Sequence, residues 1–247
     1  MEILGIDVGG SGIKGAIVDI SKGELVSEKH RIPTPEEATP EAVAETVSQL
    51  INHFNWKGEV GCGFPTPLKH GTCITSGNLH KSWKGTHVNK LFAQTSGNEF
   101  TVVNDADAAG LAEISFGAGK NVAGVVVVIT IGTGIGSAVF LDGNLLQNTE
   151  LGHVLYKNGK SYEKYAADSV RKKEKLSRKQ WGKRLNKYFK HIDLLLSPDL
   201  FIIGGGASKK LDSFKEELKV ETPIVAAEAE NEAGIIGAAM AAKFHIK

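Results

Sequence analysis

The chain alternates short apolar runs with glycine-rich turns and with segments whose apolar residues recur at helical spacing. The apolar runs predict strands at residues 2–8, 16–20, 59–63, 100–103, 124–131, 138–141, 200–203 and 222–225. Helices are predicted from residue 40, with Thr39 as N-cap and Pro40 in the first turn, and at residues 88–95, 106–113 and 233–244. Strands that alternate with helices in this way predict an α/β fold.

One arrangement occurs twice: a buried strand, a glycine-rich loop, a second strand and an aspartate. Residues 6–19, IDVGGSGIKGAIVD, align with residues 129–142, ITIGTGIGSAVFLD, with one gap. An Asp142-Gly143 turn is predicted to close the second copy. Because an internal repeat indicates a duplicated structural unit, we expect two similar lobes. We place the lobes at residues 1–107 and 108–247, and we expect the last helix to pack back on the first lobe.

The glycine-rich loops are candidate phosphate-binding elements. Glycine lets backbone N–H groups approach a phosphate without obstruction by a Cβ atom. Asp7 ends the first strand, where its carboxylate is placed to hold Mg²⁺ through water. A plain glycine-rich hairpin is the alternative for one such loop, and the first loop lacks the spacing and context of a P-loop or a Rossmann fingerprint. A third strand–glycine step, LFIIGGGAS, follows at residues 200–208, and a helix is expected to begin at Ser208.

A polar pair, Asn104 and Asp105, lies within FTVVNDADAAGLAE at residues 100–113. The pair stands where a short strand ends and a helix begins, which is where open α/β sheets bind ligands. Asp105 has an alternative interpretation as the N-cap of the helix.

Composition narrows the class of protein. The 247 residues carry a net charge of +1, so bulk charge predicts no polyanionic partner. No apolar run is long enough for a membrane helix, and the first residues lack the features of a signal peptide, so we expect a soluble cytoplasmic protein. A zinc site built from Cys62, His70, Cys73 and His80 would match no known finger or ribbon spacing.

Several motifs of the chain, taken together, resemble those of the ROK family of sugar kinases. They are the duplicated glycine hairpins, the NDADAAGLAE step, ELGH at residues 150–153, the following Glu163-x-x-Ala166 and the GGGAS turn. The resemblance covers essentially the whole chain and implies the two-lobe fold of actin and hexokinase, which is ribonuclease H-like. The motifs SGNLHKSWKGT, TIGTGIGSA and NTELGH are most similar to those of bacterial members that phosphorylate glucose with inorganic polyphosphate.

The resemblance assigns roles to individual residues. It implies that Asp105 is the general base for the sugar 6-hydroxyl. The sugar-binding residues that it implies are Asn78, Asn104, Glu150, His153 and Glu163. On the phosphate side it implies Asp7, Gly9, Gly10, Ser11, Lys14, Gly132, Thr133, Gly134, Gly205 and Gly206, with Mg²⁺ as cofactor and no metal held by protein ligands alone.

Two departures from the family pattern bear on the site. Many ROK proteins have a zinc-binding cysteine cluster shortly after ELGH, but residues 154–162 contain no cysteine. We therefore expect His153 to bind the sugar directly instead of zinc. The family often has glycine after the proline of its third-strand loop, where this chain has Thr66, so the local loop shape stays open.

Basic residues are concentrated in one segment, residues 171–190. It contains ten Lys and Arg and one acidic residue, so it carries +9 and the rest of the chain carries −8. One interpretation is a solvated helix face, and the other is an electrostatic track for a polyanion. No nucleic-acid-binding motif is present, which favours polyphosphate over nucleic acid.

The predicted activity is phosphoryl transfer from inorganic polyphosphate to glucose, with ATP as the alternative donor and mannose left open as an acceptor. A sugar-responsive repressor would carry an N-terminal helix-turn-helix, whereas the first strand is predicted from residue 2. A sugar-binding module without catalysis would not need Asp105 or both phosphate loops. We expect a homodimer and neither a nucleic-acid nor a membrane partner.

Overall fold

The computed structural model describes residues 1–77, 79–229 and 232–246, and they form two compact units. The first unit is Met1–Phe116 with Asn231–Lys247, and the second is Gly117–Glu230. The first unit thus includes residues 108–116, which the division expected from the sequence placed in the second lobe, and it includes the last helix.

The first unit is built on a mixed sheet with the strand order β3-β2-β1-β5-β8, in which β4 also pairs with β2. The strands are β1 Glu2–Val8, β2 Ile13–Asp19, β3 Glu24–Leu25, β4 His30–Ile32, β5 Val60–Phe64 and β8 Phe100–Asn104. β1 and β2 are antiparallel, whereas β1, β5 and β8 run parallel. The carboxyl ends of β1, β5 and β8 therefore lie along one edge of the sheet.

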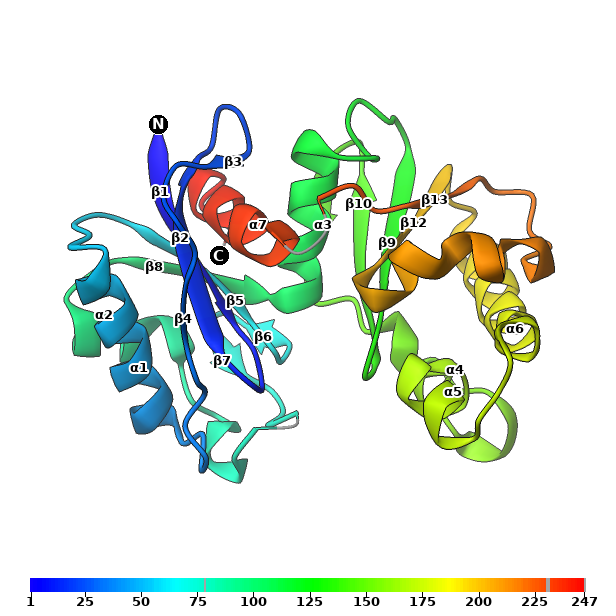
Figure 1. The fold of residues 1–247 in the computed structure, drawn as a ribbon, viewed down its shortest axis with the longest axis horizontal. Helices are drawn as coiled ribbons and strands as arrows, with labels where there is room; N and C mark the ends of the chain where they lie inside the picture. The colour runs from blue at the N-terminus through cyan, green and yellow to red at the C-terminus, as the bar shows by residue number, and fades with distance from the viewer. Residues whose placement is uncertain (78, 230–231, 247) are drawn as a thin grey trace. The chain divides into compact units, whose positions relative to one another are not determined.

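Helices cover both faces of this sheet (Figure 1). On one face, α1 Pro40–His53 and α2 Val88–Ser96 pack on a core that includes Leu4, Ile6 and Val60. The predicted start of α1 is confirmed, because Thr39 Oγ1 accepts a hydrogen bond from the Ala42 N–H at 3.3 Å. On the other face lie α3 Asp105–Phe116 and α7 Ala233–Lys243, next to each other.

The helix α7 lies directly on the backbone of the sheet and of α3. A Cβ atom on Gly61 in β5 would overlap the carbonyl oxygen of Ala238, and one on Gly237 would overlap that of Ala108. Gly5 in β1 is equally close to the backbone of Ile235. Glycine at these positions allows the sheet, α3 and α7 to form one tightly packed layer structure.

Replacing Gly61 with alanine is expected to lower the free energy of unfolding by about 1–3 kcal/mol, the usual cost of overpacking a core. Urea denaturation measures the change. Gly132→Ala is the matched control, because a Cβ there would meet no described atom within 4 Å. Equal stability of the two variants would contradict the proposed packing of α7.

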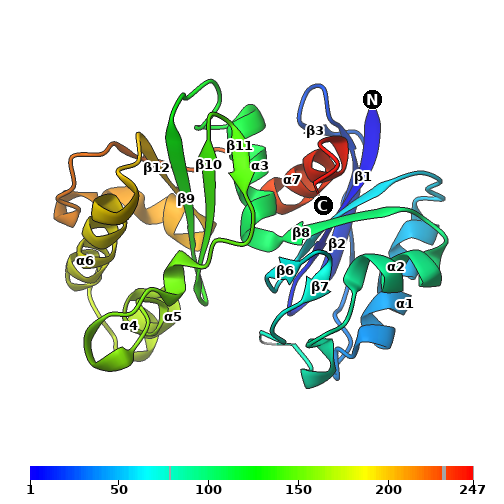
Figure 2. The ribbon, with the colours of Figure 1, turned by 180° about the vertical axis from the view of Figure 1, so that it is seen from behind.

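The second unit has a sheet of order β11-β10-β9-β12-β13 (Figure 2). Its strands are β9 Val125–Ile131, β10 Ile135–Leu141, β11 Asn144–Leu146, β12 Leu200–Gly204 and β13 Ile224–Ala226. β9 and β10 are antiparallel, and β9, β12 and β13 are parallel, so this unit repeats the strand–glycine loop–strand arrangement of the first. The predicted Asp142-Gly143 turn joins β10 to β11, with φ of 49° and 77°.

A long amphipathic helix, α6 Arg178–Leu196, packs against the sheet of the second unit through Trp181, Leu185, Tyr188 and Phe189. Two short helices, α4 Glu163–Ala166 and α5 Asp168–Lys173, precede it. The segment after β12 forms a 3₁₀ helix, η4 Gly205–Ser213, instead of the helix expected to begin at Ser208. Two glycines at its start disfavour a regular α-helical first turn, because glycine is a poor helix former.

Candidate active site

The first unit brings three polar residues to the carboxyl edge of its parallel strands. Asp7 is paired in register with Gly63, and Asn104 is paired with Phe64. Asp105 is the first residue of α3, and its Cα would lie 3.9 Å from a Cβ atom on Gly63. Because ligands of α/β sheets bind at such an edge, Asp7, Asn104 and Asp105 are the candidate site residues of the first unit.

Asn104, not Asp105, occupies the capping position of α3. Asn104 is 6% exposed, and its Oδ1 accepts a hydrogen bond from the Ala106 N–H at 2.9 Å. Its Nδ2 group is therefore the part that can donate to a ligand. Asp105 is exposed in the first turn, where its Oδ1 accepts from the same N–H at 2.8 Å and the helix dipole stabilises its negative charge.

The first glycine loop, residues 9–12, is a tight turn supported by neighbouring strands. The Gly9 N–H donates to the Gly12 carbonyl at 3.1 Å, and Thr34 Oγ1 donates to the Gly9 carbonyl at 2.6 Å. Arg31 donates to the carbonyl of Ser11. These contacts fix the backbone of the loop at the end of β1.

Asp7 and Lys14 place opposite charges at the base of this loop. Lys14 Nζ lies 3.0 Å from Asp7 Oδ2, and a Cβ atom on Gly234, in α7, would come within 2.7 Å of the same oxygen. In phosphoryl-transfer sites Mg²⁺ is commonly held by one or two carboxylates, with water and substrate phosphates as its other ligands. Asp7 beside an open glycine loop fits the expected Mg²⁺ in that way.

The second glycine loop, residues 132–134, lies between β9 and β10 in the second unit. The Gly132 N–H donates to the Gly134 carbonyl at 3.0 Å, and the Ile135 N–H donates to Glu163 Oε2 at 2.9 Å. Gly205, at the end of the parallel strand β12, packs against the backbone of Ile131. The carboxyl ends of β9 and β12 thus bring the second loop and the third glycine step together.

Close packing does not explain why three loop positions are glycine, namely Gly10, Gly132 and Gly206. A Cβ atom on any of them would meet nothing within 4 Å among the described residues, and none of them has a positive φ. Gly134 differs, because a Cβ there would overlap the Glu163 carboxylate. Open glycine backbone of this kind leaves room for a phosphate.

Glu150 directly precedes the 3₁₀ turn η2 Leu151–His153, and His153 ends it. The strand β10 holds this turn in place. Ser137 on β10 donates to the Thr149 carbonyl and accepts from the Leu151 N–H at 2.9 Å. A Cβ atom on Gly152 would overlap the carbonyl of Ile135. The glycine of the ELGH motif therefore lets this turn lie directly on the strand.

The Glu150 carboxylate is held by His153, with 3.1 Å between Glu150 Oε2 and His153 Nδ1. Burial raises the pKa of Glu150, and the negative charge of Glu163 adds to this effect. The charge and the hydrogen bond of His153 act in the opposite direction. These three side chains, all expected to bind sugar hydroxyls, thus interact with one another in the second unit.

The segment after His153, residues 154–162, forms a short hairpin instead of a cysteine cluster. Tyr162 N–H donates to the Val154 carbonyl at 3.0 Å, and Tyr156 N–H donates to the Lys160 carbonyl at 2.7 Å. The positive φ of Asn158, 58°, with the following glycine, closes the turn. Within the part of the chain that the structure describes, no three His, Cys, Asp or Glu side chains are grouped to hold a metal ion.

The basic segment is tied to the second glycine loop. Ser169 in α5 donates from its N–H to the Gly132 carbonyl at 3.3 Å and from its hydroxyl to the Thr133 carbonyl at 2.5 Å. The sequence alone left the placement of this segment open. The structure puts the start of α5 against the loop expected to bind the phosphate donor.

Arginines and lysines of this segment have different environments. Arg171 and Arg178 lie over the ring of Trp181, with guanidinium-to-centroid distances of 5.7 and 5.4 Å, and both pair with Asp168. Partial burial acts to raise the pKa of Asp168, but hydrogen bonds and charges of Arg171 and Lys172 outweigh it, so the pKa is lowered. The exposed cations of the segment are Lys172, Lys173, Lys175, Lys179, Lys183, Lys187 and Lys190.

The structure places the predicted site residues in two groups, one in each unit. Asn78 lies outside the described residues. Sequence reasoning missed Ser137 and Ser169, which hold η2 and the second glycine loop. Ser137 stands just before the strand predicted at residues 138–141, whereas the structure places it inside β10, Ile135–Leu141. Nothing in the sequence distinguishes Ser169 from other serines.

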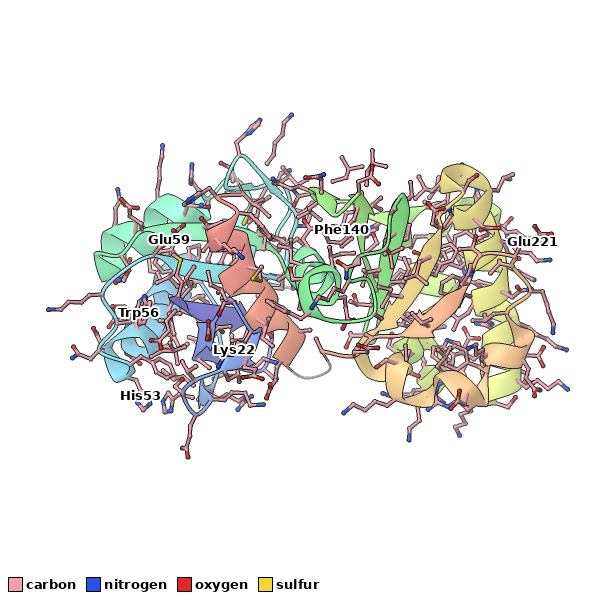
Figure 3. All side chains as sticks on the ribbon, turned by 90° about the horizontal axis from the view of Figure 1, so that it is seen from above. Lys22, His53, Trp56, Glu59, Phe140 and Glu221 are labelled. Atoms are coloured by element: carbon pink, nitrogen blue, oxygen red, sulfur yellow. The ribbon has the colours of Figure 1, made fainter. Side chains whose placement is uncertain are left out.

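A surface hollow of about 470 Å³ lies in the first unit, between the ends of α1 and α2. Trp56 and Glu59, labelled in Figure 3, line it together with Asn98. These residues lie at the start of β5 and β8, at the opposite edge of the sheet from Asn104 and Asp105. The hollow is therefore not part of the candidate site.

Comparisons with known proteins agree with this description. The ROK family pattern matches residues 3–169. The polyphosphate glucokinase of Mycobacterium tuberculosis is 48% identical over 238 residues, which are 96% of this chain and 89% of that protein. None of the described helices is long and apolar enough to cross a membrane.

Two solved structures show the fold. The inorganic polyphosphate/ATP-glucomannokinase of Arthrobacter sp. strain KM has a TM-score of 0.92 and 45% identity, with 99% of both chains covered. A Streptomyces griseus ROK glucokinase, solved with glucose and AMPPNP, has a TM-score of 0.85 at 20% identity, covering 99% of this chain and 100% of its own, and shows the fold alone. The predicted fold class, the α/β fold of actin and hexokinase with its duplicated glycine-loop units, is confirmed.

Proposed function

The chain belongs to the ROK family, and we propose that it transfers a phosphoryl group from inorganic polyphosphate to the 6-hydroxyl of glucose. The observation that carries the proposal is the 48% identity to a polyphosphate glucokinase over nearly the whole chain. The glucomannokinase that it resembles at 45% identity is named for polyphosphate and ATP, which keeps ATP as the second candidate donor.

Asp105 is the general base in this proposal. Its exposed carboxylate accepts the proton of the 6-hydroxyl as that oxygen attacks the terminal phosphorus of the donor. The N-terminal turn of α3 and the cap formed by Asn104 fix the backbone beneath it. A fixed carboxylate holds the proton acceptor in place and so reduces the reorganisation that the reaction requires.

Sugar hydroxyls need acceptors and donors on rigid supports. Glu150 and Glu163 supply carboxylate oxygens, while His153 and the Nδ2 group of Asn104 supply donors. Asn78 completes the proposed set. Several of these side chains stand at strand ends or on turns that strands hold, which suits recognition of adjacent hydroxyls.

The phosphate donor is bound by backbone and by charge. The proposed contacts are the first loop with Asp7, Gly9, Gly10, Ser11 and Lys14, the second with Gly132, Thr133 and Gly134, and the third step with Gly205 and Gly206. Mg²⁺ held near Asp7 would neutralise charge on the transferring phosphates when bound. Lys14 is already oriented by Asp7 and adds a positive charge on the same side.

Exposed lysines of α5 and α6 are the feature that favours polyphosphate over ATP. Ser169, two residues before the basic segment, bonds to the second glycine loop, and the exposed lysines of the segment follow it in the sequence. A long chain of phosphates can interact with many of these lysines, whereas ATP ends after three phosphates.

The direct test is glucose phosphorylation with Mg²⁺ and either long-chain polyphosphate or ATP, measured side by side, with mannose as a second acceptor. We expect turnover with polyphosphate and glucose. Absence of glucose 6-phosphate with both donors would contradict the proposal. A homodimer stays a further prediction, which analytical ultracentrifugation checks.

Neutralising the exposed lysines near the second loop is expected to raise the KM for polyphosphate and to flatten its salt dependence, because fewer counterions are exchanged on binding. The variant changes Lys172, Lys173, Lys175 and Lys179 to glutamine. It leaves Arg171 and Arg178 intact, because their contacts with Trp181 and Asp168 are structural.

The control for this prediction removes the same number of charges from the first unit. It changes the exposed residues Lys22, Lys57, Lys69 and Lys90 to glutamine. If both variants use long-chain polyphosphate as well as the parent protein does at low salt, the basic segment is only a solvated surface. The glucose KM should stay near that of the parent in both.

A further inference from the structure

Tyr188 on α6 has a buried hydroxyl group with no hydrogen-bond partner among the described residues. The side chain is 0% exposed, so bulk water does not reach it. A buried hydroxyl without a partner is costly, and native proteins rarely keep one without a reason. Neither the fold nor the proposed reaction described above explains it.

Tyr188 belongs to the same buried cluster on which the turn that carries Glu150 and His153 packs. The cluster contains Ile135 and Tyr162, and Leu151 of the turn packs on it. The Tyr188 and Tyr162 rings are 5.3 Å apart, centroid to centroid. The backbone of Tyr162 in turn bonds to the segment that follows His153.

The charge of Glu150 reaches Tyr188. Burial raises the pKa of Tyr188, and the negative Glu150 carboxylate raises it further. The titratable groups that interact electrostatically with Glu150 are His153 on η2, Glu163 on α4 and Tyr188 on α6. Of these three, only His153 donates a hydrogen bond to it in the structure described, although an ionised carboxylate can accept several.

A bound sugar would change the solvation and the hydrogen bonding of the Glu150 carboxylate. It displaces water from an already partly buried carboxylate, and it competes for the His153 imidazole. An additional donor from the protein interior would keep Glu150 ionised and in a fixed orientation. Tyr188, whose buried hydroxyl has no partner among the described residues, can supply that donor.

We propose that Tyr188 is a positioning residue, whose hydroxyl donates a hydrogen bond to the Glu150 carboxylate when a sugar occupies the site. This inference rests on the proposed function, because it takes Glu150 as a sugar ligand. It assigns the unpartnered hydroxyl to the sugar-bound form of the protein.

Tyr188→Phe tests the proposal, with Tyr162→Phe as the matched control. Tyr162 is equally part of the cluster, but its hydroxyl already donates to the Lys187 carbonyl at 3.2 Å. Urea denaturation of the free protein and glucose titration by isothermal calorimetry from pH 5 to 8 are measured for both variants and the parent.

The two variants are expected to differ in opposite ways in stability and in glucose affinity. Tyr188→Phe should be as stable as the parent or more stable, because it removes a hydroxyl without a partner, yet bind glucose about tenfold more weakly. The pH below which glucose affinity falls, the acid limb of the affinity profile, should be higher than in the parent. The reason is that the ionised form of Glu150 loses a hydrogen-bond donor, which raises its pKa. Tyr162→Phe should lose stability and keep the glucose affinity and its pH dependence.

Three results would overturn the inference. If Tyr188→Phe binds glucose as tightly as the parent and with the same pH dependence, the hydroxyl does not donate a hydrogen bond to Glu150. A loss of stability like that of Tyr162→Phe would show that the hydroxyl has a partner in the free protein. Failure of the parent itself to bind glucose would overturn the proposed function as well, which distinguishes that failure from the other two.

Discussion

Asp105→Asn is expected to lower kcat for glucose phosphorylation by a factor of about 100 to 10,000, the usual contribution of a general base. Asparagine keeps the shape of the side chain but cannot accept the proton of the 6-hydroxyl. The cap of α3 is made by Asn104, so the helix should remain intact. Glucose affinity should stay near that of the parent.

Steady-state kinetics with saturating polyphosphate and a separate glucose titration measure the two quantities. Asp212→Asn is the control, because Asp212 is an exposed aspartate on η4 with no proposed role in the reaction. A kcat above roughly a tenth of the parent value in Asp105→Asn would show that another group accepts the proton.

Most strands and helices could be predicted because their residues meet local requirements. The Thr39-Pro40 start of α1, the Asp142-Gly143 turn and the apolar run of β9 depend only on neighbours in sequence. The junction of β8 and α3 was visible for the same reason, since a polar pair follows an apolar run. The roles of the site residues there stay predictions.

Features that depend on tertiary contacts could not be predicted. The basic segment reads as ten equivalent cations, but packing of α5 and α6 separates arginines held by Trp181 and Asp168 from exposed lysines. The tie between Ser169 and the second glycine loop and the buried hydroxyl of Tyr188 also depend on residues distant in sequence.

The hairpin after His153 depends partly on local sequence and partly on tertiary contacts. Its Asn158-Gly159 pair is a recognised turn signal that sequence reasoning could have used. The structure shows how a backbone turn, with Tyr156 and Tyr162 packed 4.9 Å apart, orders this segment without cysteine ligands.

His153→Ala is expected to raise the glucose KM about 5- to 150-fold, which corresponds to about 1–3 kcal/mol for an unpaired buried partner. The side chain of His153 is 61% exposed, so its removal should cost little stability. Its loss leaves Glu150 without the interaction that lowers its pKa. Because burial already raises that pKa, the variant should lose glucose affinity at a higher pH than the parent as the solution is acidified.

Kinetics between pH 5 and 8 measure both effects, and His245→Ala, an exposed histidine of the first unit, is the control. A KM that rises by the same factor at every pH would mean that His153 contacts the sugar without influencing Glu150. The competing role of His153, as a ligand of structural zinc, makes a different prediction. Stoichiometric zinc in the purified protein, lost on His153→Ala together with stability, would contradict direct sugar binding. The hairpin at residues 154–162 argues against that outcome, because its hydrogen bonds and tyrosines hold the segment where a zinc cluster would otherwise be needed.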